Sequence, residues 1–159
     1  MRALIRVGVL LAMTTAGCTP TVDLTTGLEI LDTSTGWSDA GVVSGQNKLV
    51  PSVSFKLKNL SDQNLVVLQV NAIFRRGTET DEWGSGFGTA VGGEGLAPGA
   101  TTETITLNST RGYTGTETIS EMLQNSQFID AKVNLFAKYG SISWTPVAEM
   151  PIERVLIPR

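Results

Sequence analysis

Apolar residues occupy every second position from Ile129 to Tyr139, and polar residues occupy all but one of the positions between them. Because successive side chains of a strand point to opposite faces, this period of two predicts a half-buried β-strand. Stretches of similar character are found at 53–58, 65–74, 83–91 and 102–107, with turn residues between them. Shorter strands are expected at 28–31, 142–144 and 152–157, a loop or weak strand at 33–43, and a loop at 108–115. About seven strands at this spacing predict an all-β antiparallel sandwich, with a small open barrel as the alternative.

One helix is expected within this pattern. Thr118 is followed three residues later by Glu121, which is the spacing of a capping box. Ile119, Met122 and Leu123 can then share one apolar face. The sequence therefore predicts a single short helix near 119–125.

The first 17 residues have the order of a secretory signal peptide. Arg2 and Arg6 form a basic head, residues 7–13 are apolar, and small residues precede Cys18. The segment 15–18 resembles the bacterial lipobox, at which an exported lipoprotein is cut and its cysteine acylated. We therefore expect a signal peptide over 1–17, lipidation of Cys18, a tether that ends at residue 27, and a β-sandwich domain over 28–159.

The resemblance to exported lipoproteins also implies a cellular location. The residue after the cysteine is Thr19 and not aspartate, which by similarity to enterobacterial lipoprotein sorting implies the periplasmic face of the outer membrane. The apolar part of the signal is shorter than the roughly 20 residues that a spanning helix needs, so we expect no transmembrane helix.

Composition narrows the function classes. Removing Arg2 and Arg6 from the chain's 12 basic and 15 acidic side chains leaves the mature chain at a net −5, which argues against nucleic-acid binding. The chain has no histidine and one cysteine. Ser-His and Cys-His catalytic sites, and zinc sites with those ligands, therefore cannot be built. We expect no catalytic residues, no metal site and no cofactor.

Other candidate sites have ordinary structural explanations. The glycine-rich run 84–89 lacks the lysine of a phosphate-binding loop, and we interpret it as a strand whose small residues face a bulky neighbour, such as Trp83 or Trp144. The acidic residues of 79–82 are interpreted as a solvated turn in which Glu79 or Glu82 pairs with the preceding arginines.

Aromatic residues are the candidates for partner binding. Phe136 falls on the otherwise polar face of its strand, so it is exposed unless the helix near 119–125 covers it. Three tryptophans lie in predicted loops or at strand ends, where aromatic side chains can form a binding patch. The candidate partner-binding residues are Phe136, Trp37, Trp83 and Trp144.

Within 53–107 a set of turn motifs resembles the FxLYD-type and related immunoglobulin-like domains of bacterial exported lipoproteins. The motifs are Phe55, Lys58-Asn59-Leu60-Ser61, Val70-x-Ala72-x-Phe74, Gly77 and Leu96-Ala97-Pro98-Gly99-x-Thr101. The sequence Ile73-Phe74-Arg75-Arg76 departs from the Leu-Tyr-Asp that names the family. The resemblance implies an immunoglobulin-like sandwich and an envelope location, and it supplies no catalytic residue.

Three functions remain open. The first is a non-enzymatic, lipid-anchored interaction or assembly module with an envelope protein as its partner. The second is a carrier that holds a small apolar molecule or lipid inside the sandwich, lined by Val66, Val70, Ile105, Val133 and Leu135. An envelope hydrolase is the least supported of the three.

Overall fold

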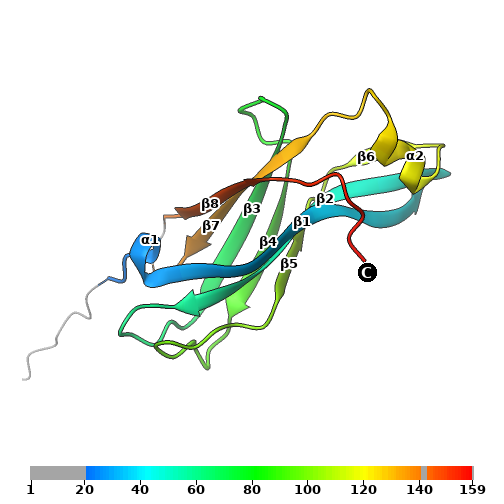
Figure 1. Ribbon diagram of the computed structural model, residues 1–159. Helices are drawn as coiled ribbons and strands as arrows, with labels where there is room; N and C mark the ends of the chain where they lie inside the picture. Colours follow the sequence, from blue (N-terminus) through cyan, green and yellow to red (C-terminus); the bar gives the residue numbers. More distant parts are fainter. Residues whose placement is uncertain (1–20, 141–142, 159) are drawn as a thin grey trace, which may run out of the picture.

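The computed structural model describes residues 21–140 and 143–158 and shows two antiparallel sheets packed face to face (Figure 1). The first sheet contains β1 (Leu28–Val43), β2 (Gln46–Asn59), β5 (Ile105–Asn108) and β6 (Tyr113–Gly115). Its order is β1-β2-β5, and β6 pairs with another part of β2. The second sheet has the order β4-β3-β7-β8, formed by β3 (Leu68–Arg76), β4 (Gly84–Val91), β7 (Ala131–Lys138) and β8 (Thr145–Pro151). The predicted all-β antiparallel sandwich is confirmed, with eight strands in the described residues.

The core lies between the sheets because each central strand buries every second residue. The alternation predicted for 129–139 is confirmed in β7, where Val133 and Leu135 are buried and their neighbours are partly exposed. In β3 the buried set is Leu68, Val70, Ala72 and Phe74. Strand β2 adds Val53, Phe55 and Leu57 from the opposite sheet. Burying such side chains is the main favourable term in folding, at about 25 cal/mol per Å² of apolar surface.

Residues 33–43, expected as a loop or a weak strand, form the second half of β1. Trp37 pairs with Pro51 of β2 and its side chain is fully buried. Two irregularities in register, after Leu31 and after Asp39, absorb Asp32, Thr33 and Gly41, whereas Gly36 pairs regularly with Ser52. Both Ser44 and Gly45 have positive φ and close the hairpin to β2, as in a two-residue turn of the mirror-image type.

Several strand limits also differ from the prediction. Strand β3 begins at Leu68 and not at residue 65, because Val67 has a φ of 55° and cannot extend the strand. Residues 113–115 form β6 inside the expected loop. The expected last strand at 152–157 is wrong: β8 ends at Pro151, and Leu156 makes a parallel bridge with Trp37 of β1.

The glycines of β4 allow the two sheets to approach each other at one edge. A Cβ at Gly86 would lie 2.6 Å from the carbonyl oxygen of Asn108, and one at Gly84 would lie 2.3 Å from the Ser109 hydroxyl. The expectation that these glycines face a bulky side chain, such as Trp83 or Trp144, is therefore wrong. The glycines face the backbone at the end of β5, where Thr110 N donates to the Ser85 carbonyl over 3.1 Å.

The predicted helix is confirmed as α2 (Ile119–Gln124). Thr118 accepts from the Glu121 amide, and the Glu121 carboxylate accepts from Thr118 in return, which completes the predicted capping box. The hydroxyl and amide of Thr118 lower the pKa of the Glu121 carboxyl.

A second helical turn, α1 (Leu24–Gly27), was not expected from the sequence. Asp23 caps it, and Leu24 is buried in the core. Val22 also packs against the core. Val22 and α1, which lie within the range expected as lipidated N-terminus and tether, thus pack against the domain.

Asn59 connects the turn at 58–61 with the turn at 96–101, the two turn motifs on which the family resemblance was based. Its side chain is fully buried and donates to the carbonyls of Gln63 and Leu96 over 2.7 and 2.8 Å. Its Oδ1 accepts from the amide and hydroxyl of Ser61 over 2.9 and 2.7 Å. All four hydrogen-bonding positions of the amide are thus satisfied, and the end of β2 is fixed to both neighbouring loops.

No helix in the described ranges 21–140 and 143–158 is both long and apolar enough to cross a membrane.

Candidate binding surfaces

The four aromatic residues predicted as a partner-binding patch lie in two separate places. Trp37 and Trp83 belong to an aromatic cluster inside one end of the sandwich. Phe136 lies on the outer face of β7, and Trp144 directly precedes β8. A single patch of all four is therefore not formed.

The aromatic cluster consists of four rings in contact: Trp37, Trp83, Tyr113 and Phe128. Phe128 meets Trp37 edge-on at 4.6 Å between centroids, and Tyr113 lies 4.9 Å from both Trp83 and Phe128. Such contacts add about 0.5–1.5 kcal/mol per pair to the burial of the rings. Trp37 is 0% exposed, so its prediction as a surface contact is wrong. It is a core residue.

Two arginines cover the outside of the cluster. The Arg76 guanidinium lies 5.6 Å from the Trp83 ring, and that of Arg154 lies 5.1 Å from the Phe128 ring. Arg76 also pairs with Glu79 at 3.3 Å, one of the pairings expected from the sequence. These contacts keep the half-buried Trp83 covered on one side.

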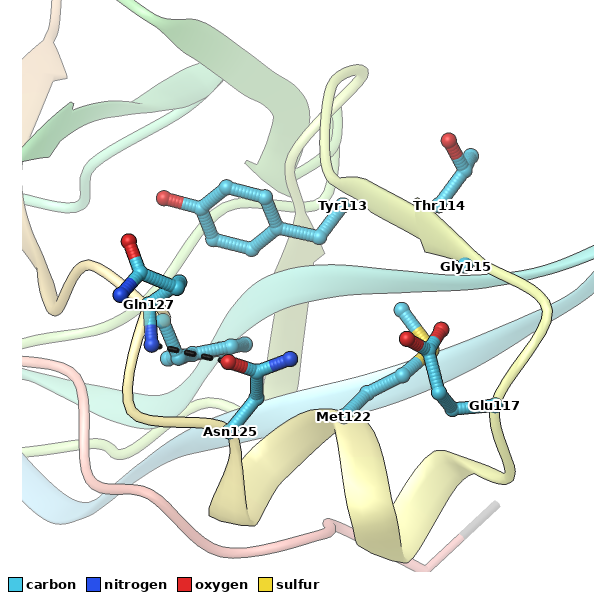
Figure 2. Close-up of a pocket in the computed structure, with 8 residues that line it drawn as sticks. Tyr113, Thr114, Gly115, Glu117, Met122, Asn125 and Gln127 are labelled. Carbon is cyan, nitrogen blue, oxygen red and sulfur yellow. Dashed lines mark hydrogen bonds between the residues drawn. The ribbon is translucent and has the colours of Figure 1, made fainter.

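A cavity of about 150 Å³ opens beside this cluster, and we call it the distal pocket. It lies between β6, α2 and the turn that follows α2, at the end of the sandwich away from α1 (Figures 1 and 2). Met122 and Phe128 are its buried apolar part, and Tyr113 is half-buried. The remaining lining residues are Thr114, Gly115, Glu117, Asn125 and Gln127.

The local sequence explains how the pocket forms. Strand β6 pairs with β2, which places Tyr113 opposite Leu49. The capping box starts α2 soon after β6 and directs Met122 inward. Gly115 leaves room for both the Met122 thioether and the Glu117 carboxylate, which lie 3.4 and 2.5 Å from the place of a Cβ. After α2, Asn125 Oδ1 accepts from the Gln127 amide over 2.8 Å (dashed in Figure 2) and fixes the turn before Phe128.

The distal pocket is a small socket of mixed character, in which the apolar side chains of Met122 and Phe128 lie beside an equally large polar lining. A cavity of about 150 Å³ is large enough for one ring the size of benzene. Tyr113 donates its hydroxyl proton to the Ile129 carbonyl over 3.2 Å, and burial raises the pKa of this phenol above its ordinary value. The tyrosine therefore stays neutral at physiological pH. Glu117 is the single carboxylate in the lining and it is exposed.

The sequence placed Met122 on the apolar face of the predicted helix but did not relate it to Tyr113 or Phe128. The three residues follow no common period, and each belongs to a different element. The capping box was the one local signal near the pocket, because it fixes where α2 begins.

The second surface is the outer face of the β4-β3-β7-β8 sheet. Phe87 is 60% exposed there and meets Trp144 edge-on at 6.0 Å, while Lys138 lies 5.0 Å from the Trp144 ring. Phe136 is half-buried on the same face, opposite Asn71 of β3. Helix α2, which was left open as a possible cover for Phe136, packs near β2 on the other sheet and does not cover it.

Beside Phe136 the outer face carries a polar network. Arg75 donates to Asn134 Oδ1 over 2.5 Å and to the Thr80 carbonyl over 2.7 Å. Asn134 donates to Glu149, which also pairs with Lys132 at 3.6 Å. The Asn134 amide is the main cause that lowers the pKa of the Glu149 carboxyl. These groups line a shallow cavity of about 280 Å³ and already satisfy one another.

The residues proposed to line a carrier's interior are placed differently. Val70, Val133 and Leu135 belong to the packed core, where each is at most 1% exposed. Ile105 is only partly buried against that core. Val66 lies outside it and is exposed. The five residues thus do not surround one open interior.

The predicted lipidation site, Cys18, lies outside the described residues. Within 21–140 and 143–158, no three His, Cys, Asp or Glu side chains are grouped as metal ligands.

No protein family and no curated protein matches the sequence. One solved structure, described as "X-ray structure of Northeast Structural Genomics Consortium target SoR45", is similar to the chain with a TM-score of 0.44 and 13% sequence identity. The match covers 82% of this chain and 89% of that chain.

Proposed function

We propose that the protein is an exported, lipid-anchored interaction module of the cell envelope, held at the periplasmic face of the outer membrane through Cys18 and without enzymatic activity of its own. The signal-like residues 1–17 and the lipobox-like segment before Cys18 support export and acylation. One acyl chain gives only marginal membrane binding, whereas two or three chains hold a protein stably.

The distal pocket is the observation that carries the binding role. It is a concave site whose apolar part is formed by the buried Met122 and Phe128 and whose other lining residues are mostly polar. Interfaces between proteins commonly place one apolar anchor in such a socket and surround it with polar contacts. We propose that the pocket receives one apolar or aromatic side chain of an envelope protein. The exposed Glu117 favours a basic group beside that side chain.

The position of the pocket supports the same proposal. Strand β1 starts next to α1 and ends at the hairpin near α2 (Figure 1). At about 3.3 Å per residue, its 16 residues span roughly 50 Å. The distal pocket therefore lies about the length of β1 away from the end of the domain that follows the anchor.

The anchor is tested by fractionation of the envelope. Wild-type protein is expected in the membrane fraction, and the Cys18→Ala variant is expected to be soluble or to remain as the uncut precursor. The two forms can be separated by size on a gel. If both variants behave alike and have the same processed size, the lipid anchor is disproved.

The pocket is tested by filling it. Gln127 is an exposed lining residue, and Gln127→Trp places an indole over the opening without changing the core. The control is Ser126→Trp, which adds the same ring one residue away at an exposed position that does not line the pocket. In crosslinked pull-downs from the envelope, Gln127→Trp is expected to lose a partner that Ser126→Trp retains. Equal recovery of all partners by both variants would contradict the pocket's role.

A further inference from the structure

The end of the sandwich around α1 combines three segments, and we call it the anchor end. The Leu60 amide donates to the Gly27 carbonyl over 2.9 Å and ties the loop 60–67 to α1. Tyr139 Oη donates to the Asn64 carbonyl over 3.4 Å and brings the β7–β8 connection to the same loop. Helix α1 itself packs beside β8 (Figure 1).

Covalent geometry keeps this end close to Cys18. Val22 packs against the core, and its Cγ1 would lie 2.8 Å from a Cβ on Gly27 of α1. Cys18 precedes Val22 by four residues. A chain spans at most about 3.3–3.6 Å per residue, so the two Cα atoms are never more than roughly 14 Å apart. An acylated Cys18 would therefore hold the anchor end against the headgroups.

The anchor end exposes large apolar side chains. Leu60 is 52% exposed and Val67 is 54% exposed, and the neighbouring Val66 is exposed as well. On the adjoining sheet, Phe87 and Trp144 form the edge-on pair described above. Tryptophan is enriched where proteins meet the membrane–water interface, because its ring is largely apolar and its N–H is polar.

The backbone of Val67 has an unfavourable conformation, whose free-energy cost folding alone does not explain. Its φ of 55° lies in the left-handed region, which is disfavoured for a β-branched residue. The conformation is held by a hydrogen bond from its amide to the Gly92 carbonyl at 3.0 Å. A strained backbone that keeps an apolar side chain in contact with solvent is typical of a contact site.

The described residues of the anchor end lack the cluster of basic residues that binds anionic lipid headgroups. Asp23, Asp62 and Glu94 are exposed there, and Lys138 lies beside Trp144. Polybasic segments bind anionic lipid through several clustered lysines or arginines, and this end has no such cluster among its described residues. Contact with a bilayer would depend on apolar burial and not on salt.

We infer that the anchor end is a second, non-covalent membrane contact, in which the exposed apolar side chains of the loop 60–67 insert into the headgroup region. The occupant of this surface is the bilayer itself. This inference rests on the lipid anchor proposed above, because a single loop of apolar residues is too small to bind lipid stably alone. The contact orients the domain so that the distal pocket faces away from the membrane.

The test uses the full, acylated chain in phosphatidylcholine vesicles. Leu60→Cys and Val43→Cys each introduce one free thiol, because the chain has a single cysteine and acylation occupies it. Leu60 and Val43 are similarly exposed, at 52% and 46%, but Val43 lies at the distal hairpin. Each thiol carries an environment-sensitive fluorophore, and the vesicles contain brominated lipid as the quencher.

Vesicle flotation separates the two proposals. We expect the protein to float with the vesicles, strong quenching at residue 60 that added salt does not change, and little quenching at residue 43. A floating protein with no quenching at residue 60 would overturn the contact but leave the anchor intact. Equal quenching at both positions would also overturn it, because the domain would then lie flat. A protein that does not float would disprove the anchor, and the inference with it.

Discussion

At the scale of single residues, the buried polar groups of this protein differ in pairing: Trp37 Nε1 and Ser52 Oγ have no hydrogen-bond partner among the described residues, whereas others are fully paired. Asn59 is the clearest case, since it is 0% exposed and uses both donors and both acceptor positions of its amide. An unpaired buried polar group costs about 1–3 kcal/mol. The turn motif therefore needs asparagine for its hydrogen-bonding pattern as much as for its size.

Replacing Asn59 by aspartate reverses one half of that pattern. In Asn59→Asp, a carboxylate oxygen would face the carbonyls of Gln63 and Leu96, which both require a donor. We expect a loss of about 3 kcal/mol or more at neutral pH, measured by urea denaturation. The loss should shrink as the pH falls, because a protonated carboxyl can donate one hydrogen bond. The exposed Asn64→Asp is the control, and an equally small loss in both variants would refute the explanation.

At the scale of elements, the packing of β4 against the end of β5 depends on residues without side chains. Glycine normally weakens a strand and is used where backbones come close. Here Gly84 and Gly86 face Ser109 and Asn108 of the other sheet. The edges of the two sheets can thus approach one another more closely than side chains would permit.

The contrast between two glycines tests this packing. A Cβ at Gly86 would lie 2.6 Å from a backbone oxygen, whereas a Cβ at Gly93 would meet nothing within 4 Å. We expect Gly86→Ala to lower the free energy of unfolding by about 1–3 kcal/mol, as overpacked sites do. Gly93→Ala should be close to neutral in the same denaturation series. Similar midpoints for the two variants would show that the sheets can separate at no cost.

The elements that the sequence predicted well are those with local signals. The alternation in β7 fixes which face is buried, because shifting a strand by one residue would reverse every side chain. The capping box at Thr118 likewise depends on residues only three apart. Phe136 was correctly placed on the polar face, but whether anything covers it depends on α2 and could not be inferred from its neighbours.

The elements that the sequence missed depend on distant partners. The second half of β1 contains Gly36 and Gly41 among small polar residues, which locally favour a loop. Its strand conformation comes from pairing with β2 and from the burial of Trp37. The distal pocket was missed for the same reason, since Tyr113, Met122 and Phe128 meet only in the folded chain.

At the scale of the whole molecule, the C-terminal segment ties the two sheets together. After β8 leaves the second sheet, the Val155 carbonyl accepts from the Trp37 amide over 2.8 Å, and the Ile157 amide donates to the Trp37 carbonyl over 2.9 Å. Ile157 also occupies the space beside Gly36, 2.6 Å from the place of a Cβ. The middle of β1 is thereby covered, which protects an edge that would otherwise pair with other strands.

Deleting residues 155–159 should therefore destabilise the protein and make it associate. Two hydrogen bonds and the burial of Ile157 are lost, and we expect a decrease of about 2–4 kcal/mol in urea denaturation. The freed edge at Trp37 is expected to give larger species in size-exclusion chromatography as concentration rises. Deletion of 158–159 alone is the control. An unchanged midpoint and a constant elution volume for the longer deletion would contradict this role of the segment.

The length of β1 has a further consequence if the anchor and the distal pocket act as proposed. This one strand extends from α1 to the hairpin beside the pocket (Figure 1). Its length therefore sets the distance between the bilayer and the bound partner. Adding one residue to β1 and its pairing residue to β2 would raise the pocket by only about 3.3 Å. The same step would rotate the added side chains to the opposite face. Unless a further bulge absorbs the extra residue, the height of the binding site can therefore change only in steps of two residues per strand.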